Sequence, residues 1–217
     1  GSGGKTTTIF QLARQMKEPV IVTATTHLGV WQLSMADRHI IAHSADVIMD
    51  LDLNPSNITL VTGEIDGERT KPIPEAVLHG LHAYCEGRSI PLLVEADGSR
   101  QRPLKAWAEH EPPIPEFTDV LVRVVGMSGL GKPLTDEFVH RAEIFSTDSR
   151  LQPGEIIDRD AIIRTLLKSE DAQSRFPPRA RGIILLNQAD SSELQAAAQG
   201  MARELLSKYQ AVIVASL

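Results

Sequence analysis

The sequence predicts an α/β domain of three layers, in which a mostly parallel sheet carries helices on both faces. Two observations indicate this class. Short apolar runs rich in β-branched residues alternate with amphipathic stretches of helical length along most of the chain. The chain also opens on a glycine-rich turn that leads directly into a helical pattern. A length of 217 residues suits one such domain with a substantial core.

The opening residues 1–8 read GSGGKTTT and precede an amphipathic run from Ile9 to Met16. Glycines let consecutive backbone N–H groups point inward, and a helix that begins near Lys5 adds its positive dipole end. This pattern predicts a phosphate-binding loop, and therefore a P-loop NTPase-like fold that binds ATP or GTP with Mg²⁺. The alternative is a glycine-rich turn that leads into an ordinary helix and has no ligand-binding role. The predicted nucleotide-binding residues are Gly1, Ser2, Gly3, Gly4, Lys5, Thr6 and Thr7.

Two residues of this loop have individual roles. Lys5 is expected to reach the outer phosphates as a point charge, and the Thr6 hydroxyl to ligate Mg²⁺. The interval from Gly1 to Gly4 is shorter than in the standard loop. In this respect it resembles the Gly-x-x-Gly-Lys-Thr loop of Mur-type ATP-dependent ligases, and the three threonines resemble those of signal-recognition-particle GTPases. Such a loop normally follows a buried central strand, so we expect that first strand to be missing before Gly1.

The run from Pro19 to Ala24 predicts a buried parallel strand. The carboxyl ends of parallel strands face the ligand crevice, so Thr25, Thr26 and His27 are candidates for positioning Mg²⁺, the γ-phosphate or water. Strand-edge threonines and a surface histidine are the alternative. Residues 28–42 are mildly amphipathic, and on a helix His39 and His43 would share one face.

Short β-like runs follow in residues 58–72, with Asp66-Gly67 predicting a hairpin turn. Pro74 then opens a predicted helix to about Glu86. Cys85 on that helix is predicted to be a small buried residue.

Residues 91–105 read PLLVEADGSRQRPLK. A strand over 92–94 delivers Glu95 and Asp97 at its carboxyl end, where phosphoryl chemistry needs an acid to hold Mg²⁺ or orient the attacking oxygen. A solvated acidic turn is the alternative. The neighbouring Arg100, Arg102 and Lys105 would bind the anionic part of a second substrate or form a solvated basic turn.

A strand over 119–125 runs into GMSGLGKP, which has the spacing of a second phosphate loop. Pro133 stands where the Mg²⁺-ligating hydroxyl should be and removes a backbone donor, so this second site is rejected. Thr135 is expected to cap a helix that runs through Phe145 and carries His140 and Arg141. A small helical insertion is expected at 146–180 within a single domain over 1–217.

The strand predicted over 181–186 ends in Asn187-Gln188-Ala189-Asp190. This resembles the Asn-Lys-x-Asp element of GTPases, in which the aspartate binds guanine and the asparagine braces the phosphate loop. Gln188 departs from the lysine of that element, and the alternative is a helix cap at Asp190 or Ser191. A helix over 191–209 and a strand over 211–215 complete the alternation.

Bulk properties limit the class of protein. A net charge of −6 without a basic run argues against nucleic-acid binding, and no apolar segment is long enough to span a membrane. One cysteine is compatible with a reducing, cytoplasmic location.

The combination of GSGGKTTT, TATTHLG, EADGSRQRPLK, HEPPIP, VVGMSGLGKPL followed by VHR, LLNQAD and VIVASL resembles the YqeC family. That family is described as accessory to selenium-dependent molybdenum hydroxylases. The resemblance implies a P-loop fold and a role in maturing a molybdenum enzyme or its cofactor, with the nucleotide and a molybdenum-hydroxylase or cofactor-maturation protein as partners.

The leading hypothesis is therefore a Mg²⁺-dependent NTPase. Lys5 would neutralise charge on the transferred phosphoryl group, Thr6 with Glu95 or Asp97 would hold Mg²⁺, and Thr26 or His27 would position the water. Asn187 and Asp190 favour GTP, whereas the loop type favours ATP. Two alternatives are a small-molecule kinase or ligase, and a nucleotide-dependent binding module without chemistry.

Overall fold

The computed structural model describes residues 2–49, 58–108, 111, 113–168 and 176–217. The chain divides into two compact units. The small unit comprises residues 6–98, and the large unit comprises residues 1–5 and 99–217. Each unit contains a parallel sheet with interleaved helices, which confirms the predicted α/β class.

The small unit is built on a four-stranded parallel sheet with strand order β2-β3-β1-β6. The strands are β1 (Val20–Ala24), β2 (Arg38–Ile41), β3 (Ile58–Thr62) and β6 (Leu92–Glu95). The central strands β1 and β3 are buried along their whole length, as expected for parallel strands. Since β1 and β6 pair with Ala24 opposite Glu95, their carboxyl ends lie at the same edge.

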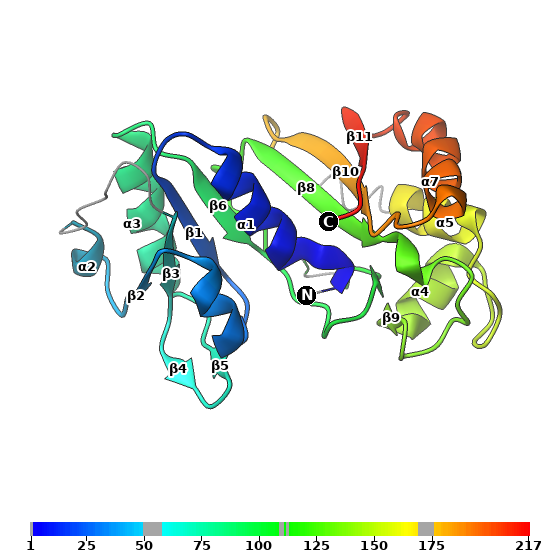
Figure 1. The fold of residues 1–217 in the computed structure, drawn as a ribbon, viewed down its shortest axis with the longest axis horizontal. Coiled ribbons are helices and arrows are strands. Elements are labelled where there is room, and N and C mark those ends of the chain that lie inside the picture. The colour runs from blue at the N-terminus through cyan, green and yellow to red at the C-terminus, as the bar shows by residue number, and fades with distance from the viewer. Residues whose placement is uncertain (1, 50–57, 109–110, 112, 169–175) are drawn as a thin grey trace. The chain divides into compact units, whose positions relative to one another are not determined.

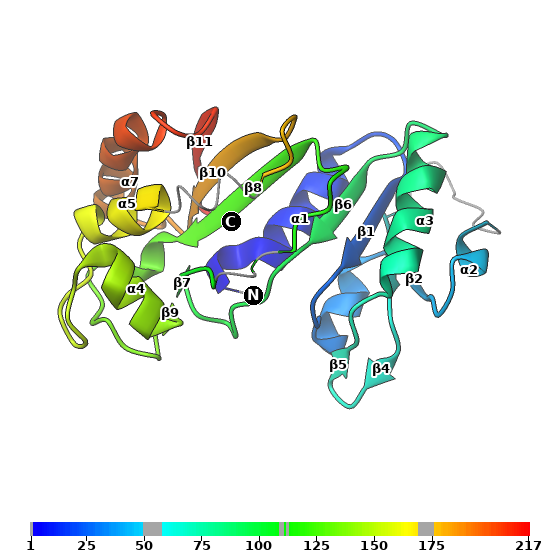
Figure 2. The same ribbon diagram turned by 180° about the vertical axis from the view of Figure 1, so that it is seen from behind.

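Helices cover both faces of this sheet. Figures 1 and 2 show α1 (Lys5–Gln15) and α3 (Glu75–Glu86) on opposite sides of the strands. Phe10 and Ala13 of α1 are buried against alternate residues of β1 and β3. This alternation sends one set of side chains to each face. The predicted helices at 5–16 and 74–86 are thus confirmed to within one residue.

The mildly amphipathic stretch over residues 28–42 is not a single helix. Residues 28–42 form a short 3₁₀ helix, η2 (Val30–Met35), and then the edge strand β2. His39 therefore lies on a strand, where its Nε2 is 2.8 Å from the Thr62 hydroxyl, and burial lowers the pKa of its imidazole. His43 lies beyond the end of that strand, near Glu64. The mild helical periodicity did not distinguish an edge strand from a helix.

A hairpin projects from the small unit. Strands β4 (Ile65–Asp66) and β5 (Arg69–Thr70) are antiparallel, and Gly67 in the turn has φ of 60°. This confirms the turn predicted at Asp66-Gly67, because a tight hairpin turn needs positive φ. A single turn of helix, α2 (Asp46–Met49), precedes residues 50–57, which lie outside the described part.

The large unit contains a three-stranded parallel sheet with order β11-β10-β8. Its strands are β8 (Val120–Gly126), β10 (Arg181–Asn187) and β11 (Ala211–Val214). β10 pairs with β8 in register from Arg181 opposite Val120 to Asn187 opposite Gly126. All three strands were predicted, because each is an apolar run bounded by polar residues or glycine.

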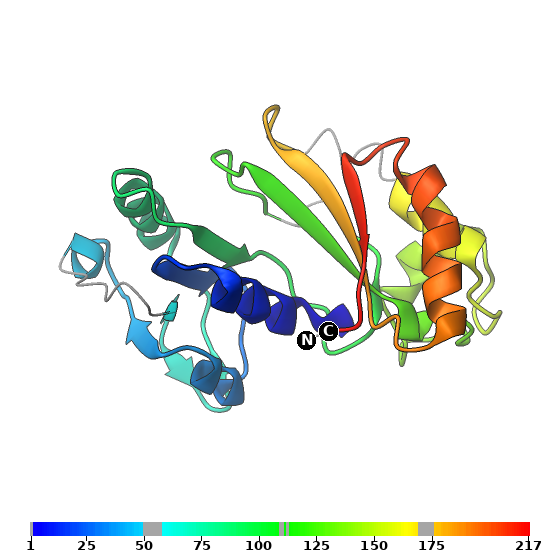
Figure 3. The ribbon, with the colours of Figure 1, turned by 45° about the horizontal axis from the view of Figure 1, so that its top comes forward.

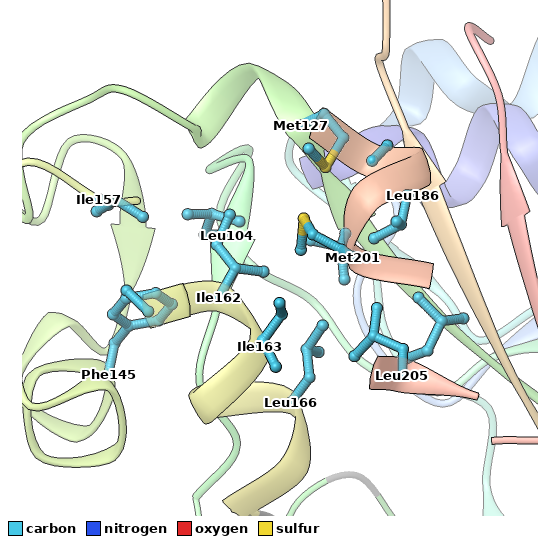
Figure 4. Packing of buried hydrophobic residues seen from close by; sticks show 14 of the residues in the cluster. Leu104, Met127, Phe145, Ile157, Ile162, Ile163, Leu166, Leu186, Met201 and Leu205 are labelled. Carbon is cyan, nitrogen blue, oxygen red and sulfur yellow. The ribbon is translucent and has the colours of Figure 1, made fainter. Parts of the chain in front are cut away.

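Three helices pack on one face of this sheet, as Figure 3 shows. They are α4 (Ala142–Ser149), α5 (Arg159–Lys168) and α7 (Ser192–Leu205). Figure 4 shows side chains of α5 and α7 meeting those of β10 in one buried cluster. Ser191 caps α7 by accepting the Leu194 N–H, which is one of the two caps that the alternative interpretation of this segment named. A short 3₁₀ turn, η3 (Met127–Gly129), follows β8.

The helix predicted from Thr135 through Phe145 is wrong. Residues 139–140 form a short strand, β9 (Val139–His140), parallel to β7 (Leu104–Lys105), and α4 begins only at Ala142. The carbonyl of Thr135 instead accepts the N–H groups of Phe138 and Val139 in a turn. Arg141 then adopts a left-handed conformation, with φ of 66°, which breaks any continuous helix.

Cys85 is 2% exposed on α3, and burial raises the pKa of its thiol to about 12. The prediction of a small buried residue is confirmed. In the described part of the chain, every helix is too short or too polar to cross a membrane.

The core of the large unit provides a test of the packing. Leu186 of β10 is fully buried, whereas Leu206 at the end of α7 is 52% exposed. We expect Leu186→Ala to lower the free energy of unfolding by about 2–5 kcal/mol, because it leaves a cavity in a packed core. Leu206→Ala should change it by less than about 0.5 kcal/mol. Urea titration followed by circular dichroism measures both, and equal losses would contradict the packing described.

Candidate functional site

The opening turn is a tight glycine loop. Ser2–Gly4 form the 3₁₀ turn η1, in which Gly3 has φ of 59° and Gly4 has φ of 83°. A Cβ on Gly3 would lie 2.9 Å from the backbone N of Gly126. Both positions therefore require glycine, for conformation and for close approach. Gly1 lies outside the described residues.

Asn187 holds this loop against the end of β10. Its side-chain Nδ2 donates to the Gly3 carbonyl at 2.6 Å, and its Oδ1 accepts the Leu217 N–H at 3.0 Å. The residue is fully buried, so these bonds satisfy polar groups that water does not reach. A Cβ on Gly4 would collide with the same amide group, at 2.5 Å from Nδ2. Asn187 thus braces the loop, which is the contact expected of it.

Lys5, Thr6 and Thr7 form the first turn of α1. A helix N-terminus presents backbone N–H groups and a partial positive charge, which suits an anion. Thr6 is buried, and its hydroxyl donates to Glu95 Oε2 at 2.7 Å. These two residues are 89 positions apart in the sequence, and both were predicted to belong to one site. Within the small unit they are in direct contact.

Glu95 ends β6 beside the end of β1. Its carbonyl accepts the Thr25 N–H at 3.1 Å, and the Thr25 hydroxyl donates to the Ala96 carbonyl at 3.4 Å. Gly98 lies against Thr26, because a Cβ there would be 3.1 Å from the Thr26 hydroxyl oxygen. The residues after β1 and those after β6 therefore lie together, as predicted from parallel strands. Asp97 lies between Glu95 and Gly98 in this same segment.

His27 has a defined tautomer in its neutral form. Its Nδ1 is 2.8 Å from the Thr70 carbonyl, which can only accept, so Nδ1 carries the proton. Nε2 then has the lone pair, and the side chain is exposed. The imidazole can accept a proton or a hydrogen bond from water at Nε2.

The residues after β10 also meet partners. Asp190 is exposed and accepts a hydrogen bond from the Ser216 hydroxyl, while Gln188 accepts one from Ser128 at 2.7 Å. The segment after β11 therefore lies beside Asp190.

An oxygen-rich donor set suits Mg²⁺, which prefers hard oxygen ligands and keeps several waters. The Thr6 hydroxyl has one proton and two lone pairs, so donation to Glu95 leaves its lone pairs available to a cation. The residues present therefore fit Mg²⁺ that arrives with phosphates. In the described ranges, no group of three or more His, Cys, Asp or Glu side chains is arranged to hold a metal ion by itself.

The brace at Asn187 generates a stability prediction. Asn187→Ala removes one donor and one acceptor, and leaves the Gly3 carbonyl and the Leu217 N–H without their partner. We expect a loss of about 2 kcal/mol or more in the free energy of unfolding. The control is Gln199→Ala, which removes an amide from the exposed face of α7 and should be near neutral. Denaturant titration measures both, and an unchanged midpoint for Asn187→Ala would contradict the brace.

Comparison with known proteins bears on the family. The YqeC protein family matches residues 1–143. A relative from Escherichia coli (strain K12), called uncharacterized protein YqeC, is 28% identical over 200 residues, which cover 89% of this chain and 75% of the relative. No solved structure matches this chain. Because the family match covers more than half of the 217 residues, the chain belongs to the YqeC family.

Proposed function

We propose that this protein binds a nucleoside triphosphate with Mg²⁺ in a P-loop NTPase-like site and hydrolyses it. The observation that carries the proposal is the buried hydrogen bond from the Thr6 hydroxyl to Glu95. It joins the residue after the loop lysine to an acid at the carboxyl end of a parallel strand. Phosphoryl chemistry needs a hydroxyl and a carboxylate together in this way.

The glycine loop supports the proposal from the large unit. Gly3 and Gly4 adopt conformations that favour glycine, and Asn187 fixes the Gly3 carbonyl. Because this loop is already ordered, nucleotide binding does not carry the entropic cost of ordering it. A larger part of the free energy of the contacts then contributes to affinity. Lys5 and Thr6 are consecutive residues of α1, so the phosphate-binding lysine and the metal-binding hydroxyl belong to one helical turn.

Each residue then has a defined task. Bound Mg²⁺ supplies charge neutralisation at the phosphates. Thr6 would offer lone pairs to it while its own hydroxyl proton points to Glu95, and Lys5 would neutralise charge on the transferred phosphoryl group. His27 orients the attacking water through Nε2, since Nδ1 is bonded to the Thr70 carbonyl. Thr26 and Asp97 are the second candidates for the water-positioning and acidic roles.

Asn187 and Asp190 favour guanine as the base. Asn187 braces the loop, and Asp190 is an exposed carboxylate beside Ser216. The short loop favours adenine through its resemblance to Mur-type ligases, so the proposal covers ATP and GTP. The cellular role we propose follows from the family resemblance: nucleotide hydrolysis would serve the maturation of a selenium-dependent molybdenum hydroxylase or its cofactor.

A small-molecule kinase or ligase is the second candidate function. The observation that favours it is a set of basic side chains around His140, including Arg102 and Lys105, which would suit an anionic second substrate. In that case turnover would depend on a small acidic or phosphorylated compound. A binding module that switches partners without hydrolysis is the third reading, and it requires binding without turnover.

Hydrolysis is tested with two variants. Lys5→Ala should lower phosphate release at least about 100-fold, because it removes a cation aimed at developing charge. Glu95→Gln keeps an acceptor for Thr6 but removes the negative charge, so nucleotide should still bind while Mg²⁺-dependent turnover falls by a similar factor. The measurement is phosphate release at saturating nucleotide, with Mg²⁺ titrated.

Glu86→Gln is the matched control, since Glu86 is an exposed acid at the end of α3. Its turnover should equal that of the parent protein. If the parent binds nucleotide but releases no phosphate with any candidate partner, the hydrolytic proposal fails and the binding module remains. If Lys5→Ala binds and turns over nucleotide as the parent does, the loop is not a phosphate site.

Base selectivity is tested at Asp190. If the base is guanine, Asp190→Ala should weaken GTP binding about tenfold or more and leave ATP binding unchanged, because a carboxylate that pairs with ring N–H groups is lost. Asp190→Asn separates this from the Ser216 contact, which an amide oxygen can still accept. Titration of both nucleotides against the three proteins measures it, and equal affinities throughout would exclude a base contact at Asp190.

A further inference from the structure

We propose that five side chains of the large unit, Arg100, Arg102, Lys105, His140 and Arg141, form a binding site for a doubly charged oxyanion, such as the phosphoryl group of a second substrate. We call these five residues the basic cluster. None of them belongs to the glycine loop, so the proposal does not depend on nucleotide hydrolysis. The proposal names the chemical class of a second ligand, and it holds for either ATP or GTP at the glycine loop.

The fold brings the cluster together through the short pair β7–β9. Lys105 lies opposite His140 in this parallel ladder. The Leu104 N–H donates to the Phe138 carbonyl, and the Ala106 N–H donates to the His140 carbonyl. These bonds fix two segments that are 35 residues apart in the sequence. Arg141 follows directly and begins α4 as its N-cap residue.

Arg102 determines how His140 is protonated. The two side chains are 3.2 Å apart, from an Arg102 terminal nitrogen to His140 Nδ1. A guanidinium can only donate, so Nδ1 accepts and the imidazole proton sits on Nε2. Burial, together with the charges of Lys105, Arg141, Arg102 and Arg100, lowers the pKa of His140 to about 4. At neutral pH the histidine is therefore an uncharged donor among four cations.

One carboxylate, Glu111, pairs with two of the four cations of the cluster. Glu111 accepts from Arg141 at 2.6 Å and pairs with Lys105 at 3.0 Å. The Lys105 side chain is only 6% exposed, so little water screens it. A ligand with two negative charges would interact more favourably with four neighbouring cations than a carboxylate, which has one.

The start of α4 adds to the positive potential. The helix has no side-chain cap bond at its N-terminus, and His140 and Arg141 lie at that end. Cations at a helix N-terminus are unfavourable, because the helix dipole is positive there. An anion at this place would interact favourably with the dipole and with the side chains together.

Arg100 and Arg102 belong to the turn that precedes β7. Arg100 and Gln101 have φ of 53° and 64°, and the Arg102 N–H donates to the Ser99 carbonyl at 3.1 Å. This is a type I′ turn without glycine, a conformation that costs energy and is often found at functional sites. Arg100 is exposed, so solvent reaches the cluster through it. The Ser99 hydroxyl is buried and lacks a hydrogen-bond partner among the described residues.

The test uses inorganic phosphate as the probe, on the whole protein at pH 7.5 and constant ionic strength. Calorimetry should detect saturable phosphate binding, and acetate should bind about tenfold more weakly. Arg102→Gln should weaken phosphate binding about tenfold or more, and Arg203→Gln, which removes an exposed arginine from α7, should not. If Arg102→Gln does not fold, Arg100→Gln at the exposed turn provides the same comparison.

Two further measurements assign the binding to this cluster. Lys5→Ala should leave this phosphate binding unchanged, because Lys5 belongs to the glycine loop. Nuclear magnetic resonance should show phosphate raising the pKa of His140 from about 4, since an anion offsets the cations that depress it. Absence of saturable binding would overturn the proposal. So would binding that Lys5→Ala removes but Arg102→Gln retains, which would assign phosphate to the glycine loop.

Discussion

A carboxylate that is buried must be paired, and in the small unit this requirement fixes the arrangement of the candidate site. Glu95 is 7% exposed and accepts the Thr6 hydroxyl. A buried carboxylate without hydrogen bonds is costly, and this bond supplies one of them. The bond holds the first turn of α1 beside the end of β6, while the Glu95 carbonyl holds the start of the segment after β1. Glu95 thus contacts residues of two other segments, one through its side chain and one through its backbone.

In the large unit, buried polar and charged groups find partners in two different ways. At Asn187, a neutral amide satisfies one carbonyl and one N–H, and every polar atom involved has a partner. Around His140, four positive charges gather, and Glu111 pairs with two of them. The first arrangement suits a rigid scaffold, because it is already complete. The second is better suited to recognition, because a charged ligand would complete it.

The sequence predicted the buried elements better than the exposed ones. β1 and most of β10 are buried, and such apolar runs are recognisable because both faces of a central parallel strand are covered. β8 is partly exposed, and its four valines made it recognisable instead. β2 is an edge strand with exposed ends, so its apolar pattern is weak and it resembled a helix. β9 has two residues, too few to show any period.

The candidate site divides in a similar way. Thr6, Glu95 and Asn187 were predicted because each follows a strand or opens a helix, and strand ends meet in parallel sheets. The contacts of Glu111 with Lys105 and Arg141 were not predicted. Glu111 lies in a proline-rich loop without periodicity, and its two partners are brought to it by strand pairing that no local pattern encodes. Registers and long-range ion pairs of this kind require coordinates.

The state of Cys85 has a practical consequence. The chain has one cysteine, and its thiol is buried. Burial keeps the thiol protonated by raising its pKa, whereas only the thiolate reacts readily with alkylating reagents. A single cysteine introduced on an exposed loop would therefore be the preferred target of a maleimide fluorophore, without prior removal of Cys85. The natural sequence already serves as a background for attaching one spectroscopic reporter at a chosen place.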